Sequence, residues 1–123
     1  TSVSMNPPLV LWSLSRRSPN LSAFENCQHF AINVLANTQR HICTQFSRPV
    51  EDRFAGVYAV DGAGGVPMIS GAMAHFECEK ENVYAGGDHI IFVGRVSRFR
   101  WHERTPLVFC ICTLYELEVS QEK

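Results

Sequence analysis

An aspartate and a histidine stand together where two glycines meet an apolar stretch. Asp88 and His89 follow Gly86 and Gly87 and come directly before residues 90–93, which are Ile, Ile, Phe and Val. Glycine adopts positive φ without strain, so the pair is predicted to lie on a tight turn that leads into a strand. His89 would then emerge at the first residue of that strand. A single histidine there is also typical of an ordinary surface residue, and these residues alone favour that interpretation.

Residues 15–20 combine positive charge with the expected start of a helix. Arg16, Arg17, the Ser18 hydroxyl and the free N–H groups of a helix start would together make a compact anion site. An ordinary capped helix with solvated arginines explains the same residues equally well.

Two further polar features could contact a ligand. Residues 1–4 place closely spaced hydroxyls and backbone donors before two prolines, which is consistent with a ligand loop and equally with an exposed turn. Asn33 lies among apolar neighbours on an expected strand. Its side-chain amide must hydrogen-bond either to neighbouring backbone or to the polar edge of a ring.

The acidic residues and cysteines favour structural interpretations. Glu77 and Glu79 have the spacing of one solvated strand face. Five cysteines form an odd set in apolar surroundings, which favours reduced thiols in a cytoplasmic protein over a disulfide framework. Cys110 and Cys112 are closer than the usual zinc spacing allows, so they are interpreted as buried core cysteines and no metal site is predicted.

The composition indicates a globular protein of one domain over residues 1–123. It has 46% hydrophobic and 19% charged residues, and the formal net charge is −1. A net charge this close to zero gives no positive electrostatic field that would attract nucleic acid. No apolar run approaches the ~20 residues of a membrane span. The first residues contain no secretory signal, and the chain starts as if from the middle of a longer sequence.

The hydrophobic pattern predicts a mainly β protein with two short helices. Residues 7–14 predict a strand buried on both faces, and residues 71–84 predict an antiparallel strand with a wet face that includes His75 and Glu77. One helix is predicted to begin at Pro19 with Ser18 as its N-cap, and a second is predicted to cover residues 37–46. Residues 61–65 predict a turn, and residues 106–119 one long strand. Roughly six strands with two early helices favour a small antiparallel barrel.

Taken in order, several segments closely resemble the flavin reductase-like family over nearly the whole chain. The matching segments are TSVSMNPPLVLWSL, SRRS, FAINVL, DRFAGV, GVPMISGAMAHFEC, GGDHIIFVGRV and PLVF. The resemblance implies an antiparallel FMN-binding split barrel, a homodimer, and an NAD(P)H:flavin oxidoreductase that supplies reduced flavin to a partner monooxygenase. It leaves open FMN or FAD as cofactor and NADH or NADPH as co-substrate. A noncatalytic flavin carrier and a truncated dimerisation module remain the alternatives.

The same resemblance implies roles for individual residues. His89 would help to place the nicotinamide, and Asp88 would orient its loop. The flavin contacts would come from Thr1, Ser2, Val3 and Ser4 at the ring or ribityl chain, Arg17 and Ser18 at the phosphate, Asn33 at the polar edge of the ring, and Arg53 as a further contact.

Two departures accompany the resemblance. Family members usually carry a few tens of residues before the first matching segment, so the barrel is expected to lack its first strands in this chain. Cys112 and Thr113 stand near a point where relatives often place a glycine.

Overall fold

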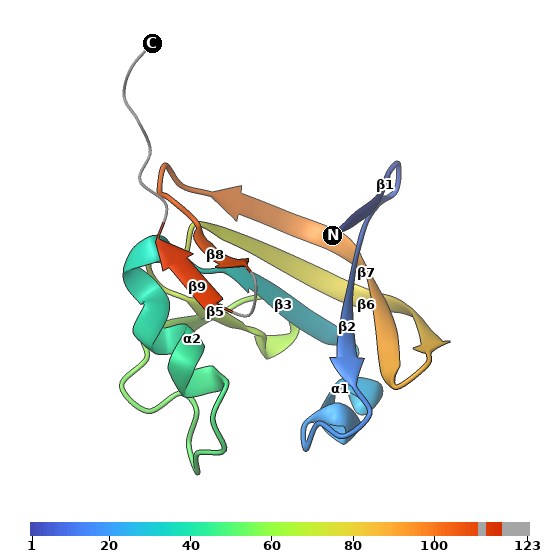
Figure 1. Ribbon diagram of the computed structural model, residues 1–123. Coiled ribbons are helices and arrows are strands. Elements are labelled where there is room, and N and C mark those ends of the chain that lie inside the picture. Colours follow the sequence, from blue (N-terminus) through green and yellow to red (C-terminus); the bar gives the residue numbers. More distant parts are fainter. Residues whose placement is uncertain (111–112, 117–123) are drawn as a thin grey trace. The chain divides into compact units, whose positions relative to one another are not determined.

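The computed structural model describes residues 1–110 and 113–116 (Figure 1). Within them lie two short α-helices, two 3-10 turns and nine strands. In chain order the elements are β1 (Ser2–Met5), β2 (Pro8–Ser15), α1 (Leu21–Asn26), β3 (His29–Val34), η1 (Asn37–Gln39), α2 (Arg40–Phe46), β4 (Ala59–Asp61), η2 (Ala63–Gly65), β5 (Pro67–Ile69), β6 (Ala74–Gly86), β7 (His89–Trp101), β8 (Leu107–Cys110) and β9 (Thr113–Glu116).

Five strands form one sheet in the order β1-β2-β7-β6-β3, while β4 pairs with β5 and β8 with β9. The β1–β2, β2–β7 and β8–β9 ladders are antiparallel. Figure 1 shows β2, in blue, beside β7, in orange. The expected mainly β fold with antiparallel strands and two short helices is therefore confirmed. None of the helices among the described residues has the length and apolar character needed to cross a membrane.

The chain divides into two compact units. The first combines Thr1–Ile32, Asp61–Val66 and Phe76–Phe99, and the second combines Asn33–Val60, Pro67–His75 and the residues from Arg100 onward. Both units are therefore assembled from segments that are far apart in the sequence.

An aromatic cluster forms the core of the first unit. Phe92, on β7, has no exposed surface, and its ring stacks on Trp12 of β2 with the ring centroids 4.9 Å apart. Phe24 of helix α1 packs edge-on against the Trp12 ring with the centroids 4.7 Å apart. Phe30 of β3 packs edge-on against the same Trp12 ring with the centroids 5.9 Å apart. Such edge-on and stacked pairs add to the free energy gained by burying the rings. The cluster thus ties β2, α1, β3 and β7 together.

Gly94 lies in the middle of β7 because a neighbouring ring occupies the space of a side chain. A Cβ atom built there would overlap the Phe30 ring and lie 2.9 Å from Cys78 Cβ. Core side chains therefore approach the backbone closely at Gly94. Cys78 is buried as expected, and desolvation raises the pKa of its thiol to about 11, so this thiol stays protonated at neutral pH.

Glu77 is buried, so its predicted place on a solvated strand face is wrong. Its side chain is only 4% exposed. Carboxylate oxygen Oε1 accepts a hydrogen bond from the Ala63 N–H at 2.7 Å, and Oε2 lies 3.8 Å from Arg98 Nε. Its neighbour Glu79 is exposed, as predicted. The Glu77 carboxylate thus anchors the glycine-rich turn of residues 61–66 within the first unit.

Replacing Glu77 with alanine is expected to lower the free energy of unfolding by about 1.5–3 kcal/mol, since it removes a hydrogen bond to a charged group. Urea unfolding measures the change. Glu79→Ala is the matched control and should change stability by less than about 0.5 kcal/mol. Equal losses in both variants would show that Glu77 behaves as a surface residue.

Three boundaries near the start of the chain differ from the prediction. Residues 2–5 form strand β1 instead of a loop or turn, and β2 is a strand as expected but none of its residues is fully buried. Helix α1 begins at Leu21 with Asn20 as N-cap, so the predicted start at Pro19 with Ser18 as N-cap is wrong. Ser18 instead accepts the Asn20 N–H at 3.2 Å, which makes a turn ahead of the helix.

The end of the described chain also differs. Residues 107–116 were expected within one strand, but β8 and β9 pair antiparallel, with Leu107 opposite Glu116. The prediction for Cys110 and Cys112 falls outside the residues whose side chains are described.

The second unit is held by buried polar contacts as well as apolar packing. The Gln39 side chain accepts the Ala36 N–H at 3.0 Å and donates to Ser70 O at 2.9 Å. His75 is buried, with its Nε2 2.6 Å from Ile69 O, so the prediction that it faces solvent is also wrong. The predicted second helix is confirmed in outline, as the 3-10 turn η1 followed by α2.

Candidate functional site

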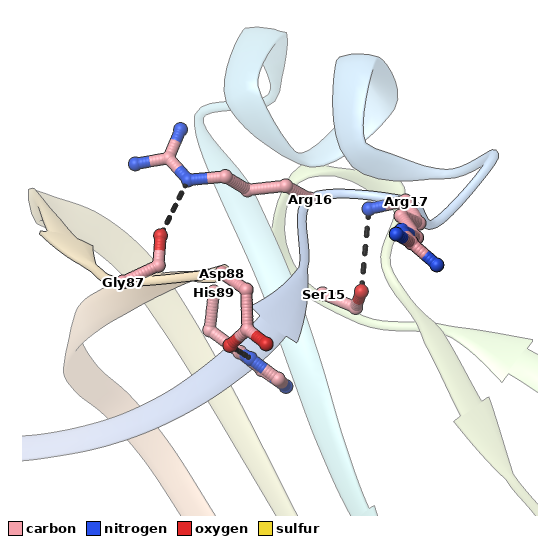
Figure 2. Close-up of polar contacts among 6 residues, drawn as sticks. All are labelled: Ser15, Arg16, Arg17, Gly87, Asp88 and His89. Atoms are coloured by element: carbon pink, nitrogen blue, oxygen red, sulfur yellow. Dashed lines mark hydrogen bonds and ion pairs between the residues drawn. The ribbon is translucent and has the colours of Figure 1, made fainter.

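The Asp88–His89 pair lies on the tight turn between β6 and β7, in the first unit. Gly87 has φ +68°, which confirms the prediction of a glycine turn with positive φ. His89 is the first residue of β7 and pairs with Ser15, the last residue of β2. The turn is therefore held beside the end of β2, as Figure 2 shows.

A hydrogen bond joins the two side chains. His89 Nδ1 lies 2.8 Å from Asp88 Oδ1, and the side chains are 46% and 96% exposed. This hydrogen bond, followed by the attraction to the imidazole, lowers the pKa of Asp88 below its usual value. The contact favours a proton on Nδ1, so a neutral ring would present Nε2 as an acceptor. The pair is thus an exposed imidazole whose orientation is set by a carboxylate.

The segment that follows β2 carries two arginines, and one of them, Arg16, reaches this turn. Arg16 Nε donates to Gly87 O at 2.8 Å, while the Arg17 N–H donates to Ser15 Oγ at 3.2 Å. In Figure 2 the Arg16 side chain reaches across to Gly87, and the Arg17 guanidinium points away from it. Both arginines are exposed. Among the described residues, the Arg17 guanidinium has no hydrogen bond or ion pair, so it is free to bind an anion.

Residues 1–4 lie at the opposite end of β2 from His89. Ser2 pairs with Val10 and Ser4 with Leu9, whereas His89 pairs with Ser15. Ser15 lies five residue steps along the strand from Val10, or about 17 Å at 3.4 Å per residue. One compact group cannot touch both ends, so a ligand shared by them must be elongated.

Asn33 and Arg53 belong to the second unit. The Asn33 amide holds β5, because Nδ2 donates to Pro67 O at 3.1 Å and Oδ1 accepts the Ile69 N–H at 2.8 Å. The amide therefore uses neighbouring backbone, one of the two alternatives that its sequence context left open. Arg53 Nε is buried and has no hydrogen-bond partner within residues 1–110 and 113–116.

Arg16 is the functional candidate that sequence reasoning used only as part of an anion site. Its contact with Gly87 joins residues 71 positions apart. Predicting this contact would require knowing that β2 pairs with β7, and the residues around Arg16 do not reveal that pairing.

The family model described as "Flavin reductase like domain" matches residues 1–117. The chain belongs to the flavin reductase-like family. The family named from the ordered sequence segments is therefore confirmed.

Known proteins resemble this flavin reductase-like domain in sequence and in structure. A protein of Rhizobium meliloti named "Probable flavin reductase" is 46% identical over 80% of this chain and 32% of its own length. The reductase subunit HsaB of a flavin-dependent monooxygenase from Rhodococcus jostii is 38% identical over 87% of this chain and 55% of its own length. The NADH:FAD oxidoreductase SgcE6 of Streptomyces globisporus, solved with NAD and FAD fragments, matches with a TM-score of 0.93 and 32% identity, covering 99% of this chain and 75% of that one. The chain thus spans about a third to a little over half of the length of these two sequence relatives.

In the first unit, this flavin reductase-like domain combines groups with different chemistry. The exposed imidazole of His89 can orient a polar ligand, and the Arg17 cation can neutralise a phosphate. Among the described residues, no group of three His, Cys, Asp or Glu side chains is placed to hold a metal ion.

Proposed function

We propose that the protein is an NAD(P)H:flavin oxidoreductase that supplies reduced FMN or FAD to a partner monooxygenase. The observation that carries the proposal is the oriented Asp88–His89 pair, exposed at the turn before β7 in a chain of the flavin reductase-like family. Relatives named FMN reductase (NADH) and NADH-dependent FAD reductase support both the reaction and the two cofactor choices.

The described residues fit a flavin nucleotide in their chemistry. Ser2, Ser4 and the nearby backbone offer donors for a ribityl chain or the polar edge of a ring, and Arg17 with Ser18 offers a cation and a hydroxyl for a phosphate. These groups occupy different ends of β2, which suits a long ligand. Val3, Thr1, Asn33 and Arg53 remain proposed contacts.

When bound, the flavin would supply the redox chemistry, accepting hydride from a reduced nicotinamide. The chain's own contribution is orientation. His89, fixed through Nδ1 by Asp88, presents its ring edge and Nε2 at the exposed end of the turn, where it would hold the nicotinamide group in place. Because the reacting carbon and its acceptor must meet within a narrow range of distance and angle, such positioning lowers the barrier.

Assembly and location follow as parts of the same proposal. Several large apolar side chains are exposed, among them Met5 at 94% and Tyr58 at 85%, and a homodimer would cover such surface. The described cysteines Cys27, Cys43 and Cys78 are free thiols, which suits a cytoplasmic protein.

The test is whether the purified protein consumes NADH when FMN or FAD is added. The expected result is a steady loss of NADH absorbance that depends on flavin, with reduced flavin accumulating when oxygen is excluded. Tight flavin binding without NADH oxidation would contradict the enzyme and indicate a noncatalytic flavin carrier. Absence of both would leave the protein as a dimerisation module.

Arg17→Ala is expected to weaken FMN binding about ten-fold, which corresponds to a charge-assisted contact of about 1.4 kcal/mol. Riboflavin lacks the phosphate that Arg17 would contact, so its affinity should fall by less than about two-fold. Fluorescence titration measures both dissociation constants. Arg48→Ala removes another exposed arginine and serves as the control. Equal losses for FMN and riboflavin would exclude Arg17 as the phosphate contact.

A further inference from the structure

Arg16 contacts both carbonyl groups of the turn that carries the Asp88–His89 pair. Its backbone N–H donates to Asp88 O at 2.9 Å, and its side-chain Nε donates to Gly87 O at 2.8 Å. The ladder between β2 and β7 ends one residue earlier, at the pair Ser15 and His89. Arg16 therefore continues the ladder by one backbone bond and adds a side-chain bond to the Gly87 carbonyl, and Figure 2 draws the second of these.

These two bonds determine the conformation of Asp88. The Gly87 carbonyl belongs to the peptide plane before Asp88, and the Asp88 carbonyl belongs to the plane after it. Each peptide is rigid, so holding the two planes holds the φ and ψ angles between them. The direction of the Asp88 Cβ atom follows from those angles.

The direction of Asp88 matters because its bond to His89 is exposed to water. The Asp88 side chain is 96% exposed, and an exposed ion pair of this kind contributes little by itself. Gly87, at φ +68°, gives the turn more freedom than any other residue would. If the turn changed conformation freely, the Asp88 carboxylate would hydrogen-bond to water instead of the imidazole much of the time. With the turn fixed, the carboxylate stays 2.8 Å from His89 Nδ1.

We propose that Arg16 is a positioning residue for hydride transfer, acting through Asp88 on the orientation of His89. The proposal rests on the proposed flavin reductase activity. Arginine suits this role because Nε donates from within the side chain, in the plane of the guanidinium. Lysine keeps the charge but has no equivalent donor.

The first experiment measures the turn itself and does not depend on activity. In Arg16→Met, hydrogen exchange of the amide at residue 16, whose N–H donates to Asp88 O, is expected to be at least about ten-fold faster than in the unaltered protein. Arg48→Met, an exposed arginine on another segment, is the control and should leave that exchange unchanged. Unchanged exchange in Arg16→Met would overturn the proposal, even if the protein proved not to be a flavin reductase.

The second experiment separates positioning from anion binding. At saturating FMN and NADH, Arg16→Met and Arg16→Lys should both slow hydride transfer about ten-fold, with the FMN dissociation constant within about two-fold. If Arg16 instead holds an anion of the ligand, Arg16→Lys would keep most of the activity and Arg16→Met would weaken FMN binding. That result would overturn the proposal. Arg16→Lys also serves if Arg16→Met fails to fold.

The third experiment asks whether Arg16 acts through Asp88. Asp88→Ala removes the carboxylate, and adding Arg16→Met to it should slow hydride transfer by less than about two-fold more, since coupled residues are not additive. Two separate losses that multiply to about a hundred-fold would show that the residues act independently. Wild-type protein without NADH oxidation would refute the activity alone, because the exchange experiment still decides whether Arg16 holds the turn.

Discussion

Replacing His89 with alanine is expected to slow hydride transfer from NADH by about 10- to 100-fold, because the ring that positions the nicotinamide is lost. FMN binding should change by less than about two-fold, since the proposed flavin contacts are made by other side chains, around β1, after β2 and in the second unit. Stopped-flow reduction of the bound flavin measures the first quantity, and fluorescence titration measures the second. The two results together separate an orienting imidazole from a flavin contact.

His41→Ala is the matched control, because His41 is an exposed histidine on α2. It should leave both quantities unchanged. Unchanged hydride transfer in His89→Ala would remove His89 from the mechanism. A loss that appears only as weaker flavin binding would reassign it to the cofactor.

Phe92→Ala is expected to lower the free energy of unfolding by about 3–5 kcal/mol, the range for deleting a buried aromatic ring. Phe92 is fully buried and stacks on Trp12, so its removal leaves a cavity at the centre of the aromatic cluster. A loss of this size is a large part of the stability of a small domain. Chemical unfolding followed by Trp fluorescence measures it.

Phe99→Ala provides the comparison on the same strand. Phe99 is 50% exposed and contacts Phe76 with centroids 4.6 Å apart. Its replacement should cost about 1 kcal/mol, because only part of the ring leaves a packed environment. If both variants lost the same stability, the cluster around Trp12 would not be the core of the first unit.

The features that depend on neighbouring residues could be predicted from the sequence. Glycines at 86 and 87 require a turn, and Gly87 has the positive φ that this turn needs. The ordered family segments identified the flavin reductase-like domain across nearly the whole chain.

Features that depend on pairing between distant segments could not be predicted from the sequence. Alternation along residues 74–79 indicates two faces of a strand, but it cannot show that a distant turn covers one of them. Glu77 is buried where it contacts that turn at Ala63, and His75 is buried where it contacts Ile69 of β5, whereas Glu79 remains exposed. Arg16 and Arg17 are neighbours of the same residue type, and only the antiparallel pairing of β2 with β7 shows that Arg16 contacts the turn.

The β2–β7 ladder joins residues that are 74 to 86 positions apart. A ribosome adds about 5–20 residues per second, so β2 would wait roughly 4 to 17 seconds before its partner is synthesised. During that interval one edge of a strand rich in Leu, Val and Trp has no neighbour, and such edges recruit other chains. The nascent chain should therefore depend on a chaperone that covers this edge until β7 is made, and slower translation should increase that dependence.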